Sequence, residues 1–106
     1  MSAEFARRSP RVEVEFFAVE VTGRGGYYRL VRNVSQEGLF FEAPADWSPQ
    51  EEGGKVILDL EPEHPHELMR IEGSVAHRGA SGVGIRVINA TRAARAWMRR
   101  LVQGNA

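Results

Sequence analysis

The sequence contains no cysteine, which excludes a disulfide framework and any zinc site with cysteine ligands. It has no run of about 20 apolar residues, the length that a helix needs to cross a bilayer, and its first residues lack the apolar stretch of a signal peptide. It has no excess of either charge, because 14 basic residues balance 14 acidic ones, whereas dedicated nucleic-acid-binding domains usually have a pI above about 9. We therefore expect a cytoplasmic protein with no membrane insertion and no nucleic acid polymer as its partner.

The charged residues that are present are unevenly distributed along the chain. Three arginines and one acid lie in the first 11 residues, and four arginines with no acid lie between residues 91 and 102. Local electrostatic fields can therefore matter despite the zero net charge. The length of 106 residues predicts one domain, which is large enough to hold a core without a metal or a disulfide.

Short runs rich in β-branched and aromatic residues predict an antiparallel all-β domain with a C-terminal helix. The runs span residues 12–21, 27–33, 39–42, 55–60, 68–77 and 83–88. The turns between them come too often for crossover helices, so neighbouring strands should be antiparallel. Closure into a small barrel would remove the exposed edges of so many short strands. Residues 43–54 hold two prolines and two glycines and predict a loop, and we expect Trp47 to fold back from it onto the core.

The first of these runs does not alternate regularly. Val12, Val14 and Phe16 share one parity, whereas Val19 and Val21 fall on the other. A change of parity inside a strand indicates a β-bulge or a sharp coil, as small barrels need. We therefore expect an irregularity in this first strand.

The hydrophobic period becomes helical near the end of the chain. Thr91 is a candidate N-cap for a helix over residues 92–102. One face of this helix carries Ala94, Trp97, Met98 and Leu101, and Arg92, Arg95 and Arg99 lie off it. The apolar face predicts a helix packed on the β-domain, and the alternative is a helix that binds a partner or forms a homodimer.

A polar segment, Asn33–Gly38, interrupts the β-pattern. Asn33 and Ser35 are two residues apart, so their side chains project to the same face of an extended chain. An amide beside a hydroxyl can bind the edge of a planar base or a phosphate oxygen. Gly38 either takes a positive φ that turns the chain or lets a ligand approach the backbone closely. The alternative is an ordinary turn in which Ser35 caps the backbone.

A second polar segment opens the chain with Arg7, Arg8 and Arg11. A guanidinium group can bind a phosphate, or the O6 and N7 atoms of guanine, through two parallel hydrogen bonds, and it can also stack on the base. Pro10 disfavours the helical region for Ser9, so this segment should be extended or bent. The alternative is a solvated tail without a ligand.

No arrangement of residues predicts catalysis, a metal or a cofactor. His64 and His66 lie among the acids Glu61, Glu63 and Glu67, but the proline between the histidines and the composition around them predict a solvated loop. His77 stands alone in a predicted strand and is interpreted as structural. Neither a catalytic triad nor a phosphate-binding loop appears in the sequence, so we expect no enzymatic function.

Together the two polar segments resemble the PilZ domain family. Arg-x-x-x-Arg at residues 7 and 11 is followed by a predicted hairpin and then by Asn-x-Ser-x-x-Gly at residues 33, 35 and 38. The resemblance covers roughly residues 5–102 and includes the glycine-bearing segment 84–87 and the closing helix. It implies a six-stranded antiparallel PilZ-type β-barrel over residues 12–90. A flexible arm over residues 1–11 would precede the barrel, and a helix over 91–102 and a tail over 103–106 would follow it.

PilZ domains are receptors for cyclic di-GMP, a bacterial second messenger. The resemblance implies that Arg7 and Arg11 hold its phosphates and guanine rings, with Arg8 assisting, and that Asn33, Ser35 and Gly38 bind from the barrel surface. It also implies signalling to an unidentified output protein that controls motility, pili or exopolysaccharide.

Two other functions are alternatives. One is an adaptor of the same fold whose protein–protein role does not depend on nucleotide. The other is an oligonucleotide-binding barrel that would stack bases on Tyr27, Tyr28, Phe40 and Phe41, which the neutral net charge disfavours.

Overall fold

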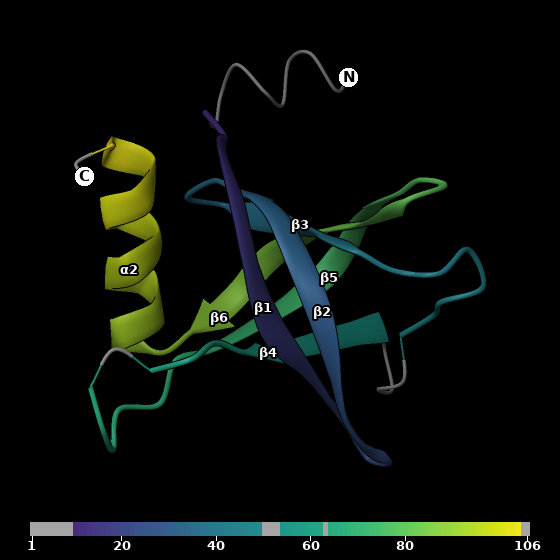
Figure 1. Cartoon of the computed structure of the whole chain (residues 1–106), viewed down its shortest axis with the longest axis horizontal. Coiled ribbons are helices and arrows are strands. Elements are labelled where there is room, and N and C mark those ends of the chain that lie inside the picture. The colour runs from purple at the N-terminus through teal and green to yellow at the C-terminus, as the bar shows by residue number, and fades with distance from the viewer. Residues whose placement is uncertain (1–9, 50–53, 63, 105–106) are drawn as a thin grey trace.

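The computed structural model describes residues 10–49, 54–62 and 64–104, and these form six strands and one helix (Figure 1). The elements are β1 (Val12–Thr22), β2 (Gly25–Val34), β3 (Gly38–Glu42), β4 (Lys55–Asp59), β5 (Arg70–Arg78), β6 (Gly82–Ala90) and α2 (Arg92–Gln103). All strand pairs are antiparallel, and they close into a barrel in the order β1-β2-β3-β6-β5-β4. The predicted all-β fold with a C-terminal helix and the six-stranded antiparallel barrel are thus confirmed.

The interior of the barrel is filled by apolar side chains that alternate with more exposed ones along the strands. Its fully buried members include Val31, Val34, Phe41, Val56, Leu58 and Ile71. Trp47 reaches this core from the loop after β3 and packs edge-to-face on Phe41, with ring centroids 5.7 Å apart. The expectation that Trp47 folds back onto the core is therefore confirmed.

The inward-facing side chains of β1 lie at even-numbered positions as far as Glu20. Ala18 and Glu20 are buried, whereas Val19 and Val21 between and after them are only half-buried. The expected irregularity exists, but it is a register shift between Glu13 and Phe16, ahead of the change of parity seen in the sequence. Glu20 can occupy an inward position because its carboxylate accepts hydrogen bonds from buried or half-buried donors.

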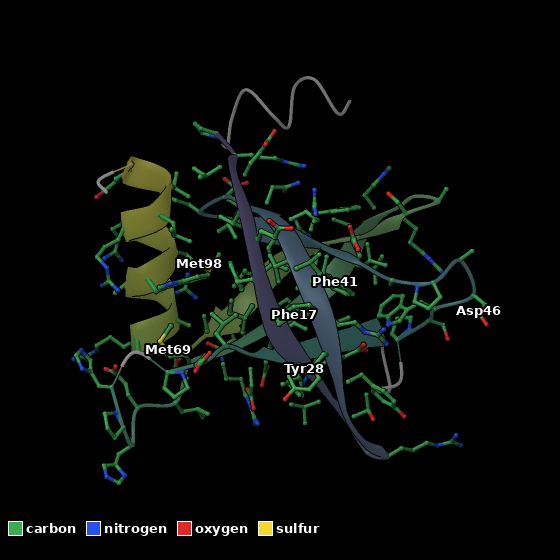
Figure 2. The ribbon with its side chains drawn as sticks, in the orientation of Figure 1. Phe17, Tyr28, Phe41, Asp46, Met69 and Met98 are labelled. Carbon is green, nitrogen blue, oxygen red and sulfur yellow. The ribbon has the colours of Figure 1, made fainter. Side chains whose placement is uncertain are left out.

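Helix α2 packs along the barrel beside β1 (Figure 1). Thr91 is its N-cap and accepts a hydrogen bond from the amide of Ala94 at 3.3 Å. Met98 is buried on the barrel side of the helix (Figure 2), and Trp97 contacts Phe16 edge-to-face with centroids 5.0 Å apart. The predicted cap and apolar face are confirmed. Within the described ranges, no helix is long and apolar enough to span a bilayer.

Strands β4 and β5 are joined by a charged pair on the outside of the barrel. Asp59 and Arg70 are direct cross-strand partners, and the guanidinium donates two hydrogen bonds to the carboxylate, at 2.7 and 2.9 Å. These hydrogen bonds to Asp59 raise the pKa of the Arg70 guanidinium above its ordinary value, so the guanidinium stays protonated.

Candidate functional site

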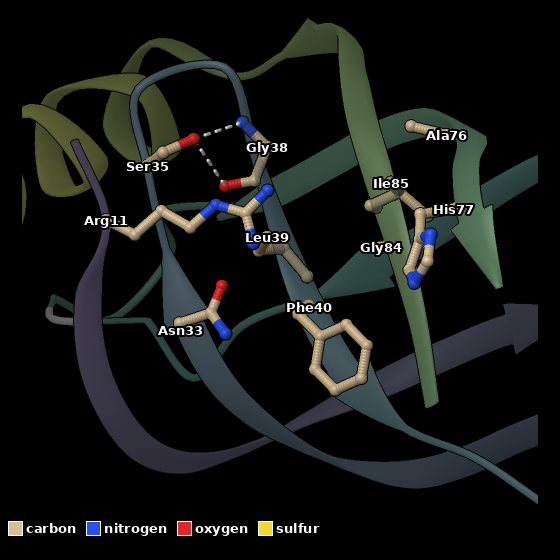
Figure 3. Close-up of a pocket in the computed structure, with 10 residues that line it drawn as sticks. All are labelled: Arg11, Asn33, Ser35, Gly38, Leu39, Phe40, Ala76, His77, Gly84 and Ile85. Carbon is tan, nitrogen blue, oxygen red and sulfur yellow. Dashed lines mark hydrogen bonds between the residues drawn. The ribbon is translucent and has the colours of Figure 1, made fainter. Parts of the chain in front are cut away.

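A cavity of about 390 Å³ opens across β2, β3, β6 and β5 (Figure 3). Ten described residues line it, and four of them belong to the two polar segments of the sequence: Arg11, Asn33, Ser35 and Gly38. The barrel thus brings the residue at the entry to β1 close to residues at the end of β2, in the turn after it and at the start of β3, although the two groups are far apart in the sequence. The remaining lining residues come from β3, β5 and β6.

Four of the lining residues form one row across the sheet. Asn33 on β2 is the cross-strand partner of Phe40 on β3, Phe40 is the partner of Gly84 on β6, and Gly84 is the partner of His77 on β5. Cross-strand partners project to the same face of a sheet. The row therefore presents an amide, a phenyl ring, a bare backbone position and an imidazole along one strip of the outer surface.

β-Bulges in β2 and β5 turn the two ends of this row outward. Register shifts lie between Val31 and Asn33 in β2 and between Val75 and His77 in β5. Each shift adds one residue to the bulged strand, which moves the next side chain to the other face of the sheet. Val31 and Val75 pack on the core, so in regular strands Asn33 and His77 would point inward as well.

Ser35 is almost fully buried and holds the turn between β2 and β3. Its hydroxyl accepts hydrogen bonds from the amides of Glu37 and Gly38, both at 3.1 Å, and donates one to the carbonyl of Gly38 at 3.3 Å. The alternative in which Ser35 caps the backbone is therefore what the structure shows, and the same residue also lines the cavity. The Ser35 hydroxyl therefore stabilises the conformation of this turn.

Gly38 is required by the packing of β3 on β6. It is not among the glycines with positive φ, which are Gly25, Gly54 and Gly104 in the described residues, so of the two alternatives for Gly38 the positive φ does not apply. A Cβ at this position would overlap the carbonyl oxygen of Ile85 on β6. Glycine is needed because the neighbouring backbone approaches closely.

Arg11 supplies positive charge to the cavity. It is exposed immediately before β1, and its side chain extends toward β3 (Figure 3). None of the described lining residues carries a carboxylate. Arg7 and Arg8 lie outside the described residues, and their position beside Arg11 stays a prediction.

Phe40, His77 and Gly84 are lining residues that the sequence motifs do not include. His77, which the sequence pattern predicts to be a structural strand residue, is instead exposed and lines the cavity. Only its cross-strand pairing with Gly84 reveals this position, because no feature of the sequence around Ala76 indicates the bulge.

The acidic and histidine-containing loop after β4 is different: Glu61, His64, His66 and Glu67 are exposed, and Glu63 is outside the described residues. No group of three or more potential metal ligands comes together among the residues described.

Comparison with known proteins agrees with this geometry. The family model of the PilZ domain matches residues 6–104, nearly the whole chain. A search of curated proteins finds no match. PilZ domains are ligand-binding receptor domains for cyclic di-GMP and are not enzymes. With a matching family model over almost its full length and a closed six-stranded barrel, the chain belongs to the PilZ domain family.

Proposed function

We propose that this PilZ domain is a receptor for cyclic di-GMP that signals to an output protein controlling motility, pili or exopolysaccharide. Arg7 and Arg11 would hold the phosphates and guanine rings, with Arg8 assisting. Asn33, Ser35 and Gly38 would form the opposing side of the site. The observation that carries this proposal is the common cavity of Arg11, Asn33, Ser35 and Gly38.

The chemistry of the cavity supports an anionic, planar ligand. Cyclic di-GMP carries two phosphates and two purines, and the cavity offers a guanidinium, an amide and an aromatic ring from Arg11, Asn33 and Phe40. A guanidinium serves both a phosphate and a guanine, since it bonds bidentately and stacks. The amide of Asn33 has donors and an acceptor and can therefore match a base edge.

The motif residues divide into two kinds of contributor. Asn33 and Arg11 present polar groups that can contact the ligand directly. Ser35 and Gly38 act through the backbone: the first fixes the β2–β3 turn with its hydroxyl, and the second lets β3 approach β6. A ligand bound here would rest on a turn that is formed before it arrives, so little ordering of that turn would oppose binding.

One observation favours the adaptor as a second candidate. Ser35 and Gly38 have contacts within the protein, so an adaptor that binds no nucleotide would need them too. An adaptor also needs a surface for its partner. Phe17 and Tyr28, exposed on the outer faces of β1 and β2 (Figure 2), form an aromatic pair with centroids 6.2 Å apart.

Calorimetric titration of the purified domain with cyclic di-GMP tests the proposal, with GTP and cyclic AMP as control ligands. Selective binding at micromolar concentrations or below is the expected result. The absence of heat and of any thermal shift would contradict the receptor and favour the adaptor. In cells, Arg7→Ala and Arg11→Ala should abolish the output phenotype of a receptor, whereas an adaptor would keep it.

A further inference from the structure

We propose that Phe40, Gly84 and His77 form a slot for one purine ring of the ligand, separate from the residues of the two sequence motifs. This inference rests on the proposed function, because it assigns a subsite within the same cavity. The two rings would stand as walls on neighbouring strands, and the bare backbone of Gly84 between them would be the floor.

The pairing of the strands sets the width of the slot. Phe40 and His77 are both direct partners of Gly84, on opposite sides of β6. Neighbouring strands are about 4.8 Å apart, so the two backbones that carry the rings are separated by roughly 10 Å. Stacked aromatic rings have centroids about 4.5–7 Å apart. The spacing therefore suits one flat ring between two side-chain rings.

The missing side chain at Gly84 keeps the floor open. A Cβ placed there would lie 3.6 Å from Cβ of His77 and 3.8 Å from Cδ1 of Phe40, so the first carbon of the His77 side chain and the ring of Phe40 flank the floor at van der Waals distance. The ring of Phe40 is held over β6 by a second glycine, since a Cβ at Gly82 would come within 2.7 Å of its Cζ. Two glycines of β6 thus shape the slot.

The bulge at Ala76 aims His77 at this slot and is itself anchored. After the bulge, His77 pairs with Gly84 on the outer face, and Arg78 pairs with the buried Val83. The Arg78 guanidinium donates a hydrogen bond to the carbonyl oxygen of Trp47 and lies 5.8 Å from the centroid of its ring. Bulges beside binding sites commonly re-aim one side chain, and here the contact of Arg78 with Trp47 anchors the strand directly after the bulge.

The slot lies within reach of the polar end of the cavity. Asn33 continues the same row on the other side of Phe40, and Gly38 is two residues away along β3, or roughly 7 Å at ~3.4 Å per residue. A purine in the slot would therefore leave the attached phosphate near the β2–β3 turn and Arg11, which line the same cavity.

Removal of one ring tests the slot by titration with cyclic di-GMP. Base–aromatic stacking is lost in His77→Leu and in Phe40→Leu, so each should weaken binding roughly 5- to 150-fold. His77→Phe keeps a flat ring and should restore most of the affinity. Phe17→Leu is the matched control, because it removes an exposed ring outside this cavity and should leave the affinity unchanged.

Filling the floor gives a second variant with an intact fold. Gly84→Ala meets only ordinary van der Waals contacts, so its melting temperature should stay close to that of the wild type while its affinity falls. In the wild-type domain, the imidazole C–H resonances of His77 should move upfield as cyclic di-GMP is added, because a stacked purine shields them.

The outcomes separate this inference from the proposed function. If the wild-type domain does not bind cyclic di-GMP, the proposed function and the slot are both overturned. If it binds, but His77→Leu binds equally tightly or the His77 resonances do not move at saturation, the slot alone is overturned. Weaker binding by His77→Leu with recovery in His77→Phe supports it.

Discussion

Trp47 donates a 3.0 Å hydrogen bond from its indole Nε1 to Oε1 of Glu20, a side chain buried on the inward side of β1. The same carboxylate oxygen accepts a hydrogen bond from Nε of Arg29 on β2 at 2.8 Å. A buried carboxylate is tolerated only where donors satisfy it. This contact therefore joins the loop after β3 to the β1–β2 hairpin.

Loss of the charge on this buried carboxylate should destabilise the domain. Glu20→Gln keeps an acceptor for Trp47 but removes the charge that Arg29 faces. It should lower the free energy of unfolding by about 1–3 kcal/mol, which urea titration followed by circular dichroism would measure. Glu15→Gln is the matched control, because Glu15 is 74% exposed and lies 3.6 Å from Arg32. Its effect should stay within about 0.5 kcal/mol, and equal stability of the two variants would contradict a structural role for Glu20.

We expect the stability of the domain to depend on the glycine of the polar motif. Gly38→Ala should destabilise the ligand-free domain by about 1–3 kcal/mol, because its Cβ would overlap the carbonyl of Ile85. Gly23→Ala, in the β1–β2 turn, meets open space and should leave the melting temperature nearly unchanged. A Gly38→Ala domain that melts like the wild type but no longer binds ligand would show instead that Gly38 serves only the ligand.

The two polar side chains of the motif, Ser35 and Asn33, should have different effects when they are removed. Ser35→Ala leaves the amides of Glu37 and Gly38 without their hydroxyl acceptor, so it should cost about 1–3 kcal/mol of stability. Hydrogen exchange of these two amides should accelerate in the free protein. Asn33→Ala should leave their exchange unchanged and weaken ligand binding. Unchanged exchange in Ser35→Ala would contradict the role assigned to the hydroxyl.

The barrel was predictable because its strands alternate in the sequence. Val56, Leu58 and Leu60 share one parity and all are buried, and most runs follow one another too closely for a crossover helix between them. The helix was predictable for the same local reasons, namely the cap at Thr91 and the spacing of its apolar face.

The features that the sequence did not reveal all depend on a partner strand or loop. Glu20 looks like an outward residue until Trp47 and Arg29 supply its donors. His77 has the parity of the inward residues of β5, and only its pairing with Gly84 shows that a bulge has turned it outward. The need for a glycine at position 38 comes from the carbonyl of Ile85, which lies on a neighbouring strand that is far away in the sequence. Local pattern determines which segments are strands, whereas register determines which side chains share a site.

The most direct test of the receptor is the loss of one guanidinium from the cavity. Arg11→Ala removes charge-assisted hydrogen bonds worth about 1.5–3 kcal/mol each, so the Kd for cyclic di-GMP should rise roughly 10- to 150-fold. Arg24→Ala removes the same charge from the exposed turn at the other end of β1 and is the matched control. Calorimetry should show weaker binding for Arg11→Ala and wild-type binding for Arg24→Ala. Equal affinities of the two variants, or no binding by the wild-type domain, would contradict the account.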